Sequence, residues 1–239
     1  MRKVSAIVGK GRQALQDLNL LKVLQSEIRH ELSANPFQNT ESGSLGDFVV
    51  DWDSLQSQDV VLRRKLAAGE EVVVSALLGS FTFRREYVFP RDVLMKVCLK
   101  KPGLSSMLHF DCEISEKGSD GSDFDIHNAY YLQKSADINP SAYRGPIISH
   151  LNPQLQDALK EYLVAKGIGE GLTNFLLHHL HKKEHGQYVN WLKKLDSTVA
   201  KGSGRSSQSQ EKYVLSKFFI FLLKLWRICN LCWSRVKSV

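Results

Sequence analysis

Near the start of the chain, apolar residues recur at spacings of three and four, which is typical of an amphipathic helix. The stripe consists of Leu15, Leu18, Leu21, Leu24, Ile28 and Leu32. Pro36 closes it, because a proline disfavours helical backbone in the residue before it. We therefore expect one helix over residues 15–32, followed by a polar loop over residues 35–46.

Between residues 47 and 132 the apolar period changes to two, which indicates β-strands. The expected strands cover residues 48–52, 60–66, 72–78, 93–101, 106–114 and 124–132. The sequence Lys101-Pro102-Gly103 has the composition of a turn and predicts a hairpin between 93–101 and 106–114. In 106–114, apolar residues alternate with His109, Asp111 and Glu113, so one face should meet a core and the other water. Consecutive strands without helices between them exclude a doubly wound α/β fold.

The pattern becomes helical again after residue 149. Asn152 is the expected N-cap of a helix that has Pro153 in its first position. Two further apolar stripes predict helices over residues 172–180 and 188–199. The expected fold class is therefore α+β, with an N-terminal helix, an antiparallel sheet and C-terminal helices.

Charge is distributed unevenly along the chain, and this changes the meaning of its net charge of +7. Residues 1–29 carry 6 cations and 2 anions, and residues 201–239 carry 8 cations and 1 anion. Residues 30–200 carry 18 cations and 22 anions, so the part expected to fold is mildly acidic. A positive net charge can indicate nucleic-acid or membrane binding, but here that indication applies to the two ends.

These basic ends set the expected domain boundaries. Residues 1–17 resemble the end of a transit peptide, which is basic and poor in acids; a solvated basic start is the alternative. Residues 202–212 are expected to be a flexible linker. In the apolar tail, residues 213–239, three cations would each cost about 2.5–3.5 kcal/mol at the centre of a bilayer. A membrane anchor and an interfacial helix stay open, but we expect a tail that does not join the core.

The side chains form no familiar catalytic motif. The sequence has no nucleophile elbow, Walker phosphate loop or zinc-protease motif. Cys98 and Cys112 fall in apolar strand patterns, which favours buried free thiols and a reducing compartment. Cys229 and Cys232 have the spacing of a redox motif but lie in the apolar tail, outside the fold context of such a motif. We expect a protein that is not an enzyme, with no catalytic, cofactor-binding or metal-binding residues and no cofactor.

Two candidate binding sets lie among the C-terminal helices. One is a run of histidines, namely His178, His179, His181 and His185. On a helix three of these imidazoles would share one face, as a metal site requires, but no carboxylate or cysteine nearby in sequence completes the site, which favours a polar helix end. The other set, Gly167, Gly169 and Gly171, follows a helix and not a strand, so a helix–helix corner is favoured over a phosphate loop.

Two further sets lie in the strand region. The loop Ser115–Asp123, with Glu116 and Asp120, lacks the spacing of a calcium-binding EF-hand, so we expect a solvated acidic loop. The basic clusters, with aromatic residues beside the second, are Arg63-Arg64-Lys65, Arg84-Arg85 and Lys100-Lys101, with Phe81, Phe83 and Tyr87. They fit an RNA-contacting surface and equally the alternating charges of a sheet's wet face.

Four stretches resemble the mitochondrial glycoprotein family, also called the mitochondrial acidic matrix protein family. They are Leu21–Phe37 (LKVLQSEIRHELSANPF), Asp92–Ile114 (DVLMKVCLKKPGLSSMLHFDCEI), Phe124–Leu132 (FDIHNAYYL) and Tyr143–Lys201. The resemblance covers residues 18–201, lies in the order and length of these stretches, and is strongest to plant members.

The resemblance implies a protomer with a long twisted sheet of about seven strands, assembled into a ring-shaped homotrimer through its terminal helices. It also implies a protein of the mitochondrial matrix without catalytic activity. Such a protein is a chaperone-like scaffold for matrix partners, including ribosomal or RNA-associated ones, that supports organellar gene expression, ribosome function and respiration. A membrane-associated variant and an RNA-binding module are the alternatives. The chain departs from the family in its weak acidity and in the residues beyond Lys201.

Overall fold

The computed structural model describes residues 2–34, 43–81, 89–117, 121–132, 143 and 145–202. These residues divide into two compact units. The first unit contains residues 2–34 and 184–202, and the second contains the described residues between 43 and 183. We refer to them as the helical unit and the sheet unit.

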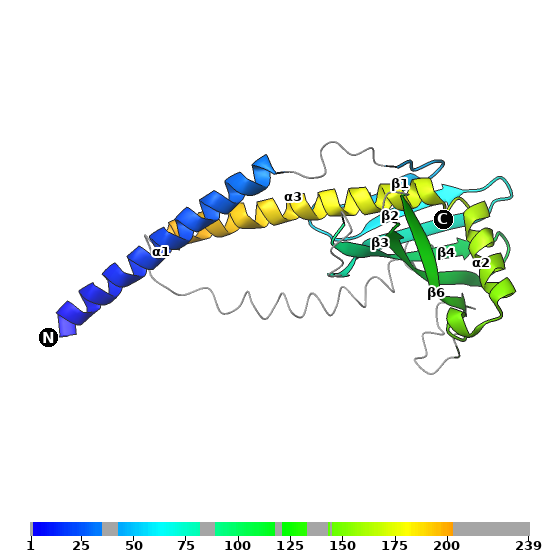
Figure 1. Cartoon of the computed structure of the whole chain (residues 1–239), viewed down its shortest axis with the longest axis horizontal. Helices are drawn as coiled ribbons and strands as arrows, with labels where there is room; N and C mark the ends of the chain where they lie inside the picture. The colour runs from blue at the N-terminus through cyan, green and yellow to red at the C-terminus, as the bar shows by residue number, and fades with distance from the viewer. Residues whose placement is uncertain are drawn as a thin grey trace. The chain divides into compact units, whose positions relative to one another are not determined.

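The sheet unit is built on six strands, each antiparallel to the next, in the same order along the chain and across the sheet (Figure 1). They are β1 (Val49–Asp53), β2 (Val60–Lys65), β3 (Glu71–Phe81), β4 (Arg91–Lys100), β5 (Met107–Glu116) and β6 (Ser122–Leu132). The predicted antiparallel sheet and the α+β class are confirmed. The described residues contain six strands, and the seventh implied by the family resemblance stays a prediction.

The predicted hairpin is the pair β4–β5. Val97 faces Phe110, and Cys98 faces His109. Gly103 in the connecting turn has a φ of 76°, a left-handed conformation that costs glycine little. The expected alternation also holds, because Phe110, Cys112 and Ile114 are buried in the core.

One face of the sheet is apolar and is covered by helices. The covering elements are α2 (Pro153–Ala165), preceded by the 3-10 turn η2 (Ile148–His150), and the first part of α3 (Glu170–Gly202). As predicted, Asn152 caps α2, because its side chain accepts a hydrogen bond of 2.9 Å from the Gln154 amide. Leu163, Leu172, Leu176 and Leu180 pack with the strand residues in a single core cluster. Removal of this surface from water is the main stabilising contribution to the fold.

Two helices are longer than predicted. α1 spans Arg2–Ser33, so it begins thirteen residues before the expected start, and α3 is one helix where the sequence predicted two. The gap in the apolar stripe between residues 180 and 188 does not interrupt the backbone. Lys183 lies in that gap, but its ammonium group is held by Asp53 and by the carbonyl of Asp59 at 2.8 Å. The proposed boundaries at residues 17, 201 and 212 stay predictions.

The helical unit contains α1 and the last part of α3. Leu24, Val189 and Leu192 are its buried apolar residues among those described. Polar pairs join the two helices, since Glu27 accepts a hydrogen bond of 3.2 Å from Tyr188 and Gln25 donates one of 3.4 Å to Asp196. Within the described part of the chain, no helix combines the length and the hydrophobicity needed to cross a membrane. The tail, residues 213–239, lies outside the described residues.

Candidate functional site

The three glycines form the corner between α2 and α3, as predicted. Gly167 follows the end of α2 with a φ of 95°, and its amide bonds to the Val164 carbonyl at 2.9 Å. Gly169 precedes α3, and its carbonyl accepts hydrogen bonds of 3.0 Å from the amides of Leu172 and Thr173. The glycines therefore end one helix and begin the next.

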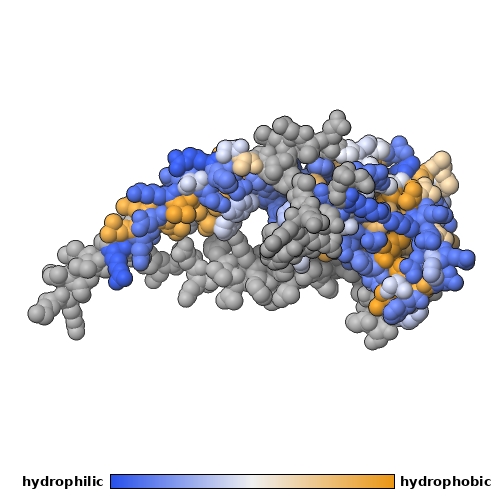
Figure 2. Space-filling view, in the orientation of Figure 1, coloured by the Kyte–Doolittle hydropathy of each residue, from blue (hydrophilic) through white to orange (hydrophobic). Residues whose placement is uncertain are grey.

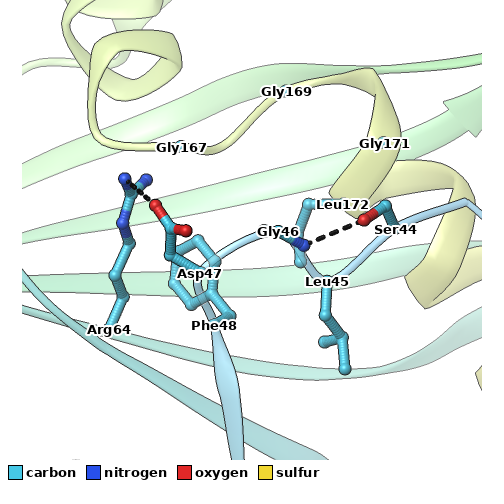
Figure 3. Close-up of a pocket in the computed structure, with 10 residues that line it drawn as sticks. All are labelled: Ser44, Leu45, Gly46, Asp47, Phe48, Arg64, Gly167, Gly169, Gly171 and Leu172. Carbon is cyan, nitrogen blue, oxygen red and sulfur yellow. Dashed lines mark hydrogen bonds and ion pairs between the residues drawn. The ribbon is translucent and has the colours of Figure 1, made fainter.

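An open pocket of about 240 Å³ lies at this corner (Figure 3). Its lining comes from the segment before β1, from β2 and from the corner, and consists of Ser44, Leu45, Gly46, Asp47, Phe48, Arg64, Gly167, Gly169, Gly171 and Leu172. The two charged residues of the lining pair with each other, because Arg64 donates a hydrogen bond to Asp47 Oδ2 at 2.6 Å. Arg64 also donates one to the Lys166 carbonyl at 3.1 Å. The guanidinium also lies over the Phe48 ring, 5.8 Å from its centroid. Arg64 thus links three segments at the pocket: its own strand β2, the segment before β1 and the end of α2.

The histidine run does not converge. His179 Nε2 lies 2.8 Å from Asp53 Oδ2, and His181 donates from Nδ1 to the Leu177 carbonyl at 2.8 Å. His178 packs edge-on against Phe89, with ring centroids 4.8 Å apart, and burial lowers its pKa although Glu116 opposes this. In the helical unit, His185 Nε2 lies 3.1 Å from Glu31 Oε2.

The sequence offered no carboxylate for these histidines, but the fold supplies two from distant segments, Asp53 and Glu31. Each of them pairs with a single histidine of the run. Among the described residues, no group of three or more histidine, cysteine, aspartate or glutamate side chains could hold a metal ion.

Carboxylates neutralise the basic clusters of the sheet unit. Arg63 is bound by Asp51 at 3.0 Å and by Glu71. Glu70 lies 3.7 Å from Lys101 and also pairs with Lys166. Residues 82–88, with the second cluster, Phe83 and Tyr87, lie outside the described residues, whereas Phe81 ends β3. Since Arg63, Arg64 and Lys101 have acidic partners, the arrangement favours alternating charge on a sheet over a surface for phosphates.

Both ends of the predicted acidic loop belong to strands, because β5 extends to Glu116 and β6 begins at Ser122. Residues 118–120, with Asp120, lie outside the described residues, and the solvated loop stays a prediction there. Asp123 lies between two lysines, 2.5 Å from Lys117 Nζ and 2.7 Å from Lys160 Nζ. Burial acts to raise the pKa of Asp123, but the hydrogen bonds from the two lysines lower it to about 2.

The position of Asp123 predicts a pH-dependent contribution to stability. Its depressed pKa in the folded state stabilises the fold above the ordinary aspartate pKa, and this stabilisation is lost as pH falls towards 2. With an allowance for solvent screening, Asp123→Asn should lower the free energy of unfolding by about 1–2 kcal/mol at pH 7 and by about half as much near pH 3. Urea titrations at both pH values measure this. Asp157→Asn, on the exposed side of α2, is the control; an equal loss from Asp123→Asn at both pH values would rule out the charge as the cause.

Sequence reasoning missed one arrangement on the other face of the sheet. His109 was expected to face water, yet it is 8% exposed and lies beside Cys98, which is 4% exposed. The signal was the predicted hairpin, because the register that aligns its apolar residues also places position 98 opposite position 109.

Apolar side chains also remain exposed on the helical unit (Figure 2). On α1, Leu15 and Val23 are each 64% exposed, whereas Leu24 is buried. At 3.6 residues per turn, Leu15 lies opposite Leu24 on α1, and Val23 lies about 100° around the helix from Leu24. A helix that is apolar on more than one side is usually covered by more than one neighbour.

Part of the chain is similar in sequence to known proteins. Residues 91–199 match the model of the mitochondrial glycoprotein family. The mitochondrial acidic protein mam33 of Schizosaccharomyces pombe is 31% identical over 105 residues, which cover 39% of this chain and 36% of that protein. The match therefore spans about a third of the length of that curated relative.

Two solved structures share the fold. One is the crystal structure of the p22 protein of Trypanosoma brucei, with a TM-score of 0.57 and 19% identity. The other, with a TM-score of 0.56 and 16% identity, is a Leishmania major protein of unknown function described as a sequence homologue of human p32. Each alignment covers 77% of this chain and 99% of the other. Residues 91–199, which contain β4, β5, β6 and the helices that follow them, are therefore similar to the mitochondrial glycoprotein family.

Proposed function

We propose that this protein is a binding protein of the mitochondrial matrix, without catalytic activity, that works as a homotrimeric scaffold. The mitochondrial location is supported by the family that it matches and by the relative from Schizosaccharomyces pombe, which is mitochondrial by name. Its role is to hold matrix partners, ribosomal or RNA-associated ones among them, and so to support organellar gene expression, ribosome function and respiration. The observation that supports assembly most directly is the exposed apolar side of α1.

Self-association explains the exposed apolar residues of α1 better than a solvent-facing role of that helix does. Leu15 and Val23 are largely exposed, and Leu18 and Leu32 are 54% and 57% exposed on the same helix. On α3 of the same unit, Trp191 is 49% exposed. Exposed apolar groups that gather on one unit mark an interaction surface. Copies of the chain that bring these helices together would cover all of them without any further partner.

The assembly predicts a specific change in mass. Leu15→Glu combined with Val23→Glu places two charges on the proposed interface, where their desolvation opposes association. We expect wild-type protein at the mass of a trimer and the variant at the mass of one protomer, measured by light scattering after size-exclusion chromatography.

The matched control is Leu155→Glu combined with Val164→Glu, which changes the same residue types at 47% and 50% exposure on α2. It should leave the mass unchanged. A monomeric wild type would contradict the assembly, as would an unchanged mass in the α1 variant. In cells that lack the protein, the wild type but not the α1 variant should restore the rate of mitochondrial protein synthesis. Equal rescue by both would separate the function from the trimer.

A further inference from the structure

Cys98 lies on the sheet face opposite the helices, next to an imidazole and a carboxylate. Its neighbours in β4, Val97 and Leu99, belong to the helix-covered core, whereas Cys98 clusters with Val61 and Val73 on the other face. In the β4–β5 register Cys98 lies directly across from His109, and its Sγ is 3.5 Å from His109 Nδ1. The second ring nitrogen, Nε2, lies 3.0 Å from Asp111 Oδ1. Thiol, imidazole and carboxylate therefore form one continuous hydrogen-bonded chain.

Asp111 determines which nitrogen of His109 carries the proton. Burial acts to raise the pKa of Asp111, but its hydrogen bond with His109 and the charge of Lys96, 3.7 Å away, lower that pKa to about 2. At neutral pH this carboxylate is ionised and can only accept hydrogen bonds. The proton of the neutral imidazole therefore belongs on Nε2. The lone pair on Nδ1 then points to the Cys98 thiol, as a general base requires.

The surrounding strands support this arrangement. Tyr130 of β6 hydrogen-bonds to Asp111, and its ring centroid is 5.6 Å from that of His109. Lys96 of β4 lies 3.7 Å from Asp111 Oδ1, the same oxygen that His109 contacts. On β2, two strands away from Cys98, Arg63 is occupied by Asp51 and Glu71. Tyr130 and Lys96 thus help to keep Asp111 in place, and the imidazole cannot turn away without losing its partner.

From this geometry we propose that Cys98 is a nucleophilic thiol, with His109 as its base and Asp111 as the positioning residue, and that its reactant is a small hydroperoxide. The thiol is 4% exposed and packs beside two valines, so only a small, uncharged electrophile reaches it. A thiol, an imidazole and a positioning polar group at hydrogen-bond distances are the arrangement that activates cysteine nucleophiles on unrelated folds.

The reaction balances with hydrogen peroxide as the oxidant. His109 Nδ1 takes the thiol proton, and the Cys98 thiolate attacks one peroxide oxygen. The S–O bond forms as the O–O bond breaks, so sulfur loses two electrons and the peroxide gains them. The departing hydroxide takes the proton back from His109 and leaves as water. Cys98 is then a sulfenic acid, which an external thiol can reduce.

Cys112 provides an internal reference in the same hairpin. It is 3% exposed, which matches the exposure of Cys98, but it lies in the helix-covered core. Burial raises the pKa of Cys112 to about 12, and the charges of Asp111 and Asp125 add to this effect. Because the thiolate is the reactive form, Cys112 should stay unmodified under conditions that oxidise Cys98.

The experiment treats the reduced full-length protein with hydrogen peroxide, traps sulfenic acid with dimedone and quantifies each cysteine by peptide mass spectrometry. We expect Cys98 to be labelled at least about tenfold faster than Cys112, since one pKa unit alone changes the thiolate fraction tenfold. His109→Gln should abolish the difference in labelling rate between Cys98 and Cys112. Asp111→Asn should slow labelling and change its dependence on pH, which a merely structural role of Asp111 would not do. Cys112→Ala should leave the labelling of Cys98 unchanged.

Each alternative result overturns the proposal. Equal labelling of Cys98 and Cys112 in the wild type would do so, and this comparison needs no variant to fold. Unchanged labelling in a folded His109→Gln variant, as judged by its circular dichroism, would exclude His109 as the base. Labelling of Cys98 that appears only above the ordinary pKa range of a thiol would show that Cys98 is not activated.

Discussion

Replacing Phe110 by alanine should lower the free energy of unfolding of the sheet unit by about 3–5 kcal/mol. Phe110 is 1% exposed on β5 and belongs to the core that α2 and α3 cover. In the register it lies between Val97 of β4 and Ala129 of β6. Small neighbours held on two strands cannot fill the space that the ring leaves, so a cavity term adds to the lost burial. Urea unfolding followed by circular dichroism measures the loss.

The control for this substitution lies in the adjoining turn. Leu104 is 53% exposed, and Leu104→Ala should change stability by less than about 0.5 kcal/mol. Two similar losses would mean that the apolar face of the sheet does not carry the stability assigned to it.

A second large effect is expected at the corner between α2 and α3. Gly167 has a φ of 95°, which costs a residue with a side chain about 1–2 kcal/mol. A Cβ there would lie 2.0 Å from Arg64 Nη1, so the guanidinium would have to move away from Asp47 and from the Lys166 carbonyl. With the loss of these charge-assisted hydrogen bonds, Gly167→Ala should cost about 3 kcal/mol in total. Thermal and urea unfolding both measure this quantity.

Gly169 is the matched control, because it lies in the same corner. It has no positive φ among the backbone angles, and an added Cβ would meet nothing within 4 Å. Gly169→Ala should therefore have little effect on stability. If Gly169→Ala cost as much as Gly167→Ala, the corner would need flexibility at both positions, and the contact with Arg64 would not explain the difference.

The sheet was predictable because its signals are local. The alternation in residues 106–114 and the Pro102-Gly103 turn lie within one hairpin, so they determine strand, turn and register together. The glycine corner was predictable for the same reason, since a left-handed residue after a helix is a common C-terminal cap.

The helices were predicted less well, because an apolar stripe reports packing and not backbone continuity. Gly186 and the lysines at 182 and 183 interrupt the stripe, and a glycine inside a helix costs about 1 kcal/mol relative to alanine. α3 continues through them nevertheless. At Lys183 the reason is a partner over a hundred residues away in sequence, Asp53 of β1. No local pattern contains that partner.

The same difference between local and distant contacts decided which features of the candidate sites could be predicted. Asp53 pairs with His179 and Glu31 pairs with His185. Both carboxylates come from other elements, so residues 178–185 alone do not predict these pairs. The pairing of Cys98 with His109 requires only the hairpin register. It was overlooked because a buried cysteine and a polar strand residue each have an ordinary explanation when taken separately.

The strand order of the sheet has a consequence for how the chain folds. Each strand after β1 pairs with the one that precedes it, so the sheet can grow hairpin by hairpin as the chain emerges from a ribosome. Short sequence separations between pairing strands favour rapid formation. Among the described residues, the helices that cover the apolar face are α2 and the first part of α3, which follow the strands in the chain. A chain that has emerged as far as β6 therefore presents a nearly complete sheet whose apolar face is exposed to water. This intermediate is the one most in need of a chaperone.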